Sequence, residues 1–267
     1  MKNRSYPVSN QGVSDIIESD SIASNGDASG RLTKGYSRSQ LSVLKRLYQL
    51  HEKFLGRENS HVHCKRGCSI CCTCNVTITT IEGQFLVNSI PEGNRAAIKR
   101  QLHENISPRR YDPRITTNGL AALCMGENDL PGEENEPSWG KCPILTEENL
   151  CPFYEARPLG CRTLISREPC DKNGYAVISP LTLTINNLFM QCIEHLDARG
   201  YSGNFTDIVI LSLEHGPDAD PGTLPGGRNG AREIHLIENQ PIPALMIPPE
   251  HREAVTPILE DIAVIFG

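Results

Sequence analysis

The sequence predicts a mainly α-helical fold with irregular cysteine-rich loops, that is, a small α-rich domain stapled by metal, with a few short strands. Three observations support this prediction. Apolar residues recur at helical spacing in several segments. The cysteines fall in stretches that show neither helix nor strand periodicity. Aromatic residues make up only 5% of the 267 residues, so we expect a modest core that needs reinforcement.

The first predicted helix covers residues 37–56. Ser37 and Gln40 have the spacing of a capping box, in which each residue satisfies a backbone N–H of the other. Gly56 is expected to end the helix. Between these signals, one apolar stripe follows helical spacing: Leu41, Leu44, Leu47, Tyr48, His51, Phe54 and Leu55.

Further segments complete the expected secondary structure. Thr79 and Glu82 form a second capping box, which predicts a helix that runs to about Ile90 after a short extended piece. The remaining expectations are a polar helix over residues 94–106, a loop over 107–140, an amphipathic helix with its apolar face from Leu181 to Leu196, a buried helix or strand over 205–214, an extended stretch over 233–247, and a short final helix that begins at Pro249 and is interrupted by Pro257.

Composition suggests three parts along the chain. Residues 1–36 are rich in Ser, Asn, Asp and Gly and show no periodicity, so we expect a disordered or loosely attached arm. Residues 37–215 are predicted to form the cysteine-cluster domain. Residues 216–267 begin with a Gly/Pro/Asp loop and are predicted to form a C-terminal extension that packs on that domain.

Charge and hydropathy restrict the class of partner. The net charge is −6 and the pI is about 5.8, which argues against a nucleic-acid-binding protein. No run of 18 apolar residues exists, so no membrane span is expected. The N-terminus lacks the apolar stretch of a signal peptide, which favours the cytoplasm. A metal ion is the expected partner, and the sequence does not indicate a protein partner.

Cysteine is the residue type that stands out. The chain contains 11 cysteines and no export signal. Structural disulfides are rare in a reducing compartment, where clustered cysteines more often bind metal or carry out redox chemistry. The odd number also leaves at least one thiol unpaired in any scheme that uses only disulfides.

The first cysteine block consists of Cys64, Cys68, Cys71 and Cys72. Intervals of two or three residues let thiolates turn toward one ion, as a Zn–S distance of about 2.3 Å requires. Adjacent side chains point apart in most backbone conformations. Cys71 and Cys72 therefore suggest a two-metal site, a polynuclear cluster, or one ligand beside one spectator.

The second block contains Cys142, Cys151, Cys161 and Cys170. The two blocks together supply enough thiolates for two tetrahedral ions, or for one four-iron cluster with ligands to spare. We therefore expect zinc or iron ions, or alternatively a [4Fe–4S] cluster, and we expect the two blocks to lie close together. Four basic residues are candidates to offset the thiolate charge: Lys65, Arg66, Arg157 and Arg162.

A known family shares this pattern of cysteines. Cys64-x3-Cys68-x2-Cys71-Cys72, followed by Cys142-Pro143 and by Cys151-x5-Arg157-Pro158-x2-Cys161-Arg162, resembles the zinc- or iron-chelating domain family named for its CxxCxxCC signature, the YkgJ-like cysteine-cluster proteins. The similarity covers roughly residues 60–195. It implies a cysteine-rich metal site and little else, because the biochemical role of that family is poorly defined.

Two other classes of protein fit the same cysteines. The first is an iron–sulfur or thiol-based oxidoreductase. Its radical S-adenosylmethionine form is less favoured, because that fold needs a strand before the cysteine motif and regular strand–helix alternation after it. The second class is a zinc-stapled interaction module. The sequence shows no nucleophile–base pair and no phosphate-binding glycine loop, which weakens the case for an enzyme without excluding it.

The remaining cysteines and the nearby histidines are predicted to have simpler roles. Cys192 lies on the apolar face of a predicted helix, where a cysteine usually acts as a small core residue. Cys74 and Cys124 are expected to be spectators. His61 and His63 flank the first block, and loop histidines are mostly solvated, so solvation is expected rather than metal ligation.

Overall fold

The computed structural model describes residues 35–58, 62–64, 67–126, 129, 131–132, 134–216, 228–229 and 232–267. Within these residues the chain is mainly helical and contains a small three-stranded antiparallel sheet, which confirms the predicted fold class. Residues 1–34 of the predicted arm and residues 217–227 of the predicted loop lie outside the described residues. None of the described helices is long and apolar enough to cross a bilayer.

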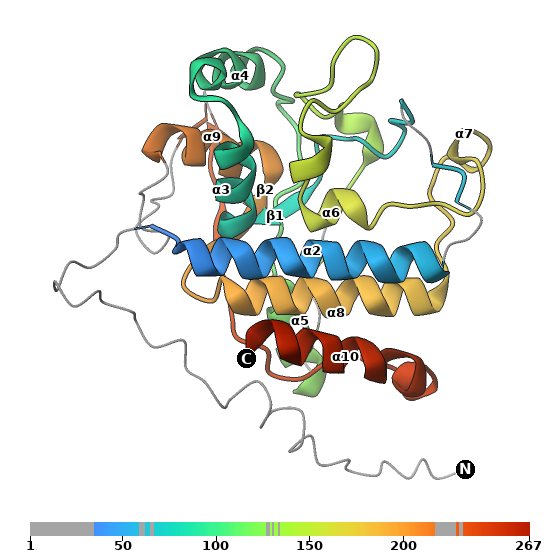
Figure 1. The fold of residues 1–267 in the computed structure, drawn as a ribbon. Coiled ribbons are helices and arrows are strands. Elements are labelled where there is room, and N and C mark those ends of the chain that lie inside the picture. Colours follow the sequence, from blue (N-terminus) through green and yellow to red (C-terminus); the bar gives the residue numbers. More distant parts are fainter. Residues whose placement is uncertain are drawn as a thin grey trace, which may run out of the picture.

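Three long helices lie against one another and form the larger apolar core (Figure 1). They are α2 (Arg38–Glu58), α8 (Pro180–Leu196) and α10 (Arg252–Phe266), and we refer to them together as the helical layer. Their contact surfaces are fully buried: Leu44, Leu47 and Phe189 are 0% exposed. This burial explains why an apolar stripe at helical spacing predicts both α2 and α8.

The ends of these helices follow from local chemistry. The capping box predicted at the start of α2 is confirmed, because the Gln40 N–H donates to Ser37 Oγ at 3.1 Å and the Ser37 N–H donates to Gln40 Oε1 at 3.0 Å. At the start of α8, Ser179 Oγ accepts a hydrogen bond from the Thr182 N–H at 3.2 Å. Pro180 takes the first helical position, where no N–H is needed.

A second core lies around the small sheet. The sheet has the order β1 (Thr77–Thr79), β2 (Tyr201–Asn204), β5 (Leu236–Glu238), and all of its pairings are antiparallel. Helices α3 (Thr80–Ser89) and α9 (Phe205–His215) pack beside it. A Cβ on Gly83 would lie 2.5 Å from Ile208 Cγ2, so only glycine permits this close helix contact. The apolar run at 205–214 is thus a buried helix and not a strand.

The other helices and strands complete the described chain. They are α4 (Glu92–Glu104), α5 (Thr117–Met125), η1 (Pro137–Trp139), η2 (Tyr154–Ala156), α6 (Leu159–Arg162), α7 (Cys170–Asn173), η4 (Pro249–His251) and the two-stranded pair β3 (Arg228–Asn229) and β4 (Arg232–Glu233).

Helix α5 corrects the expectation of a continuous loop over residues 107–140. Thr116 Oγ1 accepts from the Gly119 N–H at 3.0 Å, which caps the helix. The Asn118 N–H donates to Glu194 Oε2 of α8 at 2.7 Å, so the helix is fixed by a contact with a distant part of the sequence. Periodicity within residues 107–140 could not reveal that contact.

The final helix also differs from expectation. Pro257 was expected to interrupt it, yet α10 continues through Pro257 to Phe266. A proline removes one hydrogen bond from a helix interior at a substantial cost. The cost is offset here because Val255 and Ile258 are buried against the helical layer at 0% and 1% exposure.

Buried polar groups connect the two cores. Asp197 follows α8 and accepts hydrogen bonds from the Ile81 N–H at 3.0 Å and from the Thr80 hydroxyl at 2.8 Å, both at the start of α3. The Tyr36 hydroxyl bonds to the same carboxylate, so the last residue of the predicted N-terminal arm is anchored to the core. Burial raises the pKa of Asp197 to about 7.

Candidate metal centre

Two loops that carry cysteines lie side by side. The His63 N–H donates to the Ser166 carbonyl at 2.9 Å, and the Ser166 N–H donates to Cys64 Sγ at 3.3 Å. The Cys71 thiol donates to the Leu164 carbonyl at 3.8 Å. The first cysteine block is therefore held against the chain that follows Cys161.

Ser166 also holds together the loop that places Cys170 next to the first cysteine block. Its side chain is buried, its hydroxyl donates to the Glu168 carbonyl at 2.6 Å, and it accepts from the Val177 N–H at 2.9 Å. Cys170, which begins α7, is also buried. The sequence analysis did not identify Ser166, since no motif marks a serine that organises a loop in this way.

Four thiols share this neighbourhood. Burial raises the pKa of Cys64, the Ser166 N–H opposes the rise, and the nearby thiols of Cys68, Cys71 and Cys170 add to it. We call these four cysteines the loop-side group. It combines three members of the first block with the last member of the second block, a division that spacing along the sequence did not predict.

The side chains of Cys71 and Cys72 meet, although adjacent side chains were expected to point apart. The contact with Cys72 is the largest cause of the raised pKa of Cys71, and burial is the second. The Thr73 N–H donates to the Cys71 carbonyl at 3.0 Å, so the backbone turns tightly at this point. Cys72 thus stays in contact with the loop-side group.

A short antiparallel bridge joins the two cysteine blocks. Thr73 pairs with Lys141, and the Cys142 N–H donates to the Cys72 carbonyl at 2.9 Å. The Cys74 N–H donates to the Gly140 carbonyl at 3.0 Å on the other side of the pair. The two blocks therefore lie against each other along the backbone.

Cys142, Cys151 and Cys161 form a second neighbourhood, which we call the core-side group. Burial raises the pKa of Cys161, Cys142 and Cys151 raise it further, and Arg157 opposes the rise. Burial likewise raises the pKa of Cys142 to about 12, with a further contribution from Cys151. Cys142 and Cys151 pack against the second apolar core.

Two arginines lie beside the core-side group, and both form ion pairs with Glu52 of α2. Arg157 lies over the Tyr154 ring, with its guanidinium carbon 3.7 Å from the ring centroid, and it lowers the pKa of Cys151. Arg162 forms an ion pair with Glu52 of α2 and lies 4.3 Å above the Tyr48 ring. Arg157 also lies 3.8 Å from the Glu52 carboxylate, so both arginines attach this segment to the helical layer, and Arg157 is in addition placed to offset thiolate charge.

Glu82 attaches the same segment to the second core. Its Oε1 accepts from the Leu159 N–H at 2.7 Å and from the Tyr48 hydroxyl at 2.9 Å, and its Oε2 accepts from the Thr79 N–H at 2.9 Å. The capping box revealed the contact with Thr79. Nothing in the sequence indicated that the same carboxylate also caps the helix that carries Cys161.

The other candidates lie in simpler surroundings. Cys192 is 1% exposed in the core of the helical layer, as predicted, and Cys124 is exposed on α5. Cys74 is buried, donates to Asn75 Oδ1 at 3.3 Å, and lies near Cys142. His63 is exposed, and His61 lies outside the described residues.

The thiols are not arranged as a preformed metal cage. Among the described residues, no group of three or more His, Cys, Asp or Glu side chains is placed closely enough to hold a metal ion. All 11 cysteines are free thiols. The cysteines of the two neighbourhoods are therefore near one another without forming a metal cage.

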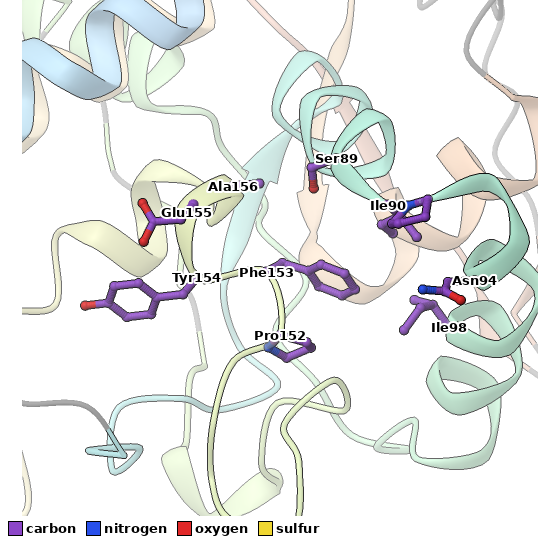
Figure 2. Close-up of a pocket in the computed structure, with 10 residues that line it drawn as sticks. Ser89, Ile90, Asn94, Ile98, Pro152, Phe153, Tyr154, Glu155 and Ala156 are labelled. Carbon is purple, nitrogen blue, oxygen red and sulfur yellow. The ribbon is translucent and has the colours of Figure 1, made fainter.

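A pocket of about 440 Å³ lies where the segment that follows Cys151 approaches α3 and α4 (Figure 2). The end of α3 and helix α4 form one wall, and residues 152–156 form the other. Figure 2 shows the Phe153 ring directed toward Ile90 and Ile98, and the Tyr154 ring directed away from them. No cysteine lines the pocket, so it is separate from both groups of thiols.

No protein-family model, no curated protein and no solved structure matches the chain. The similarity to the YkgJ-like cysteine-cluster proteins therefore rests on the cysteine motif quoted above.

Proposed function

We propose that this chain binds zinc or iron ions through the thiolates of its two cysteine blocks. The observation that carries the proposal is the hydrogen bond from Ser166 to Cys64 Sγ, which joins segments 102 residues apart and brings Cys170 beside the first block. The proposed ligands come from the predicted set: Cys64, Cys68, Cys71, Cys72, Cys142, Cys151, Cys161 and Cys170.

The donor chemistry supports this proposal. The loop-side group has as many thiols as the four-cysteine sets that hold structural zinc or iron–sulfur clusters. Burial keeps the thiols protonated in the metal-free chain, because it raises the pKa of Cys64, Cys142 and Cys161. A bound ion replaces those protons, so metal affinity is expected to fall in acid.

The fold argues against one form of the oxidoreductase alternative. Helix α2 precedes the first cysteine block, and the sheet of the described chain is antiparallel. A radical S-adenosylmethionine enzyme needs strand–helix alternation with parallel strands at that place. A [4Fe–4S] cluster on the same thiols is still a competing identity for the metal group.

An interaction module stapled by zinc is the second candidate function. Two large apolar side chains on the loops of the cysteine blocks are exposed to solvent: Ile70 is 45% exposed and Tyr175 is 68% exposed. A partner surface that covers these side chains would use the metal for structure and not for chemistry. Metal binding is common to this candidate and to the leading proposal.

Anaerobic purification followed by elemental analysis and visible absorption tests the proposal. We expect the parent and Cys124→Ser to carry equal amounts of metal and Cys170→Ser to carry less, because Cys124 is exposed away from both groups. A brown protein with iron and sulfide identifies a cluster, and a colourless protein with zinc identifies a structural or chelating site. A parent protein without metal contradicts the proposal, and so does unchanged metal content in Cys170→Ser.

A further inference from the structure

We propose that Tyr36, Thr80 and Asp197 share one extra proton in a closed set of hydrogen bonds, and that loss of this proton releases the segment before α2 from the core. The three residues come from distant parts of the chain: Tyr36 precedes α2, Thr80 begins α3, and Asp197 follows α8. We call them the proton-sharing cluster. The inference does not depend on the proposed metal binding.

Each side chain of the cluster has an oxygen atom close to an oxygen atom of each of the other two. The Tyr36 hydroxyl oxygen lies 2.5 Å from Asp197 Oδ1 and 2.8 Å from Thr80 Oγ1, and Thr80 Oγ1 lies 2.8 Å from Asp197 Oδ2. Two oxygen atoms this close attract each other only when a proton lies between them, so three contacts need three protons. The hydroxyls of Tyr36 and Thr80 carry one proton each. The third proton therefore belongs to Asp197.

A protonated Asp197 completes the set of hydrogen bonds in one direction. Its carboxyl O–H donates to the Tyr36 oxygen, the Tyr36 O–H donates to Thr80 Oγ1, and the Thr80 O–H donates to Asp197 Oδ2. The Tyr201 N–H of β2 also donates to Thr80 Oγ1, at 3.0 Å, and the Asn239 side chain donates to Asp197 Oδ2 at 3.1 Å. Groups in and after the sheet thus hold Thr80 and Asp197 in place.

The surroundings of Asp197 favour its protonated form. Burial raises its pKa to about 7, and the negative charge of Glu82 on α3 acts in the same direction, although the hydrogen bonds from Tyr36, Thr80 and the Ile81 N–H oppose the rise. Among the described residues, Asp197 has no ion-pair partner. An ionised Asp197 would therefore be a buried charge without compensation, which is costly.

The other ionisable groups on the elements around Asp197 are directed elsewhere. On α8, Glu194 accepts hydrogen bonds from backbone N–H groups of α5 and of residue 240, and His195 accepts one from the Ile242 N–H. Arg199, after α8, and Glu238 of β5 are exposed to solvent. Titration of the cluster is thus governed by Asp197 and its contact with Glu82.

Tyr36 is the member of the cluster that can move when the proton is lost. Thr80 is 1% exposed and Asp197 is 2% exposed, whereas Tyr36 is half-buried. Water reaches an ionised Asp197 most readily when Tyr36 moves away. The next residue, Ser37, caps α2, so this movement also loosens the first turn of that helix.

The direction of the pH dependence follows from the raised pKa. The closed cluster binds a proton more tightly than a solvated carboxyl group does, so acid favours closure. The equilibrium between closed and open forms shifts toward opening as the pH rises toward about 7, and it becomes independent of pH above that value.

Infrared spectroscopy of the full chain tests whether Asp197 holds the proton. The C=O stretching band of a protonated carboxyl group should disappear with a midpoint near pH 7, and the difference between the parent and Asp197→Asn should isolate this band. Asparagine has the same shape and no charge, and its amide N–H replaces the carboxyl O–H toward Tyr36. The cluster of this variant should therefore stay closed at every pH.

Trypsin cleavage after Arg38, in the first turn of α2, tests whether proton loss opens the segment. The cleavage rate of the parent divided by that of Asp197→Asn should rise about tenfold from about pH 6 to about pH 8, because opening releases a proton and cleavage follows the population of the open form. This ratio removes the pH dependence of trypsin itself. Tyr36→Phe, which lacks the hydroxyl, should be cleaved faster than the parent at pH 6.

Two results would overturn the inference. Equal carboxyl bands in the parent and Asp197→Asn would mean that the Tyr36 proton is divided between Thr80 and an ionised Asp197. A cleavage ratio that does not change with pH would mean that the segment stays closed without the proton. If circular dichroism shows that Asp197→Asn does not fold, the ratio of the parent to Tyr36→Phe, whose segment should be open at both pH values, provides the same comparison.

Discussion

Apolar side chains hold the helical layer together, whereas the cysteine region, by which we mean the described residues of 62–76 and 137–178, combines hydrogen bonds between loops with packing on the second core. In the helical layer the side chains of Leu44, Leu47 and Phe189 are completely buried. In the cysteine region the loop around Cys64 is held by single hydrogen bonds, such as the one from Ser166, while Cys142 and Cys151 pack on the second core. Under the proposed function, bound metal would add stability to the loop around Cys64.

The first prediction concerns the helical layer and has the largest expected effect. Phe189→Ala should lower the free energy of unfolding by about 3–5 kcal/mol, because the ring is 0% exposed and its removal leaves a cavity. Urea unfolding of the parent and the variant measures this loss. Leu183→Ala on the exposed face of α8 is the control, with little expected change. A similar loss in both variants would mean that burial of the apolar face of α8 is not the main source of its contribution to the free energy of unfolding.

The second prediction uses two thiols whose pKa is raised to about 12, Cys192 in the helical layer and Cys142 in the cysteine region. The folded protein keeps these protons above pH 9, whereas the unfolded chain releases them. Alkaline solution therefore favours unfolding, by roughly 1 kcal/mol per pH unit for each thiol between pH 9 and about 12. This contribution to stability is fully present below pH 9.

Bound zinc should change the pH dependence that is due to Cys142 and leave that due to Cys192 unchanged. The slope of unfolding free energy against pH should become shallower in Cys192→Ala whether or not zinc is bound, because burial alone raises its pKa. In Cys142→Ala the slope should become shallower only in the metal-free protein, since a thiolate bound to zinc has no proton to lose. Unfolding series at several alkaline pH values provide the slopes. Equal behaviour of the two variants with zinc would show that Cys142 is not a ligand.

The smallest expected effect lies at the start of α2. Ser37→Ala removes the acceptor for the Gln40 N–H and should cost about 1 kcal/mol, as for other N-caps. Thermal unfolding followed by far-ultraviolet circular dichroism measures the change. Ser37→Asp retains an acceptor and should restore most of the stability. We expect the zinc content of both variants to equal that of the parent, and a change there would link the cap to the cysteine region.

Local signals in the sequence were sufficient for much of the fold. The capping boxes at Ser37 and Thr79 depend on residues three positions apart, and both occur as expected. The apolar stripe of α8 depends on spacing alone. Structure that depends on a distant partner was not predicted: α5 depends on Glu194, and α10 continues through Pro257 while one of its faces, which includes Val255 and Ile258, is buried in the core.

The candidate site shows the same limit. Clustering along the chain singled out the cysteines, and their spacing indicated thiolate chemistry. The assignment of Cys170 to the loop-side group depends on Ser166, and the position of Cys161 depends on Glu82. Both contacts link residues far apart in sequence, so neither could be predicted from a single sequence without a three-dimensional arrangement.

The only tryptophan of the chain, Trp139, lies at the end of η1 inside the cysteine region. Its carbonyl accepts a hydrogen bond from the Ser107 hydroxyl at 2.7 Å, and the Arg109 guanidinium lies 5.0 Å from the centre of its ring. The next residue, Gly140, pairs with Cys74. The protein therefore carries its single indole fluorophore in the region where metal is proposed to bind, and the helical layer has none. Tryptophan emission will report on the cysteine region by itself, while the ellipticity of the same sample reports on the helices.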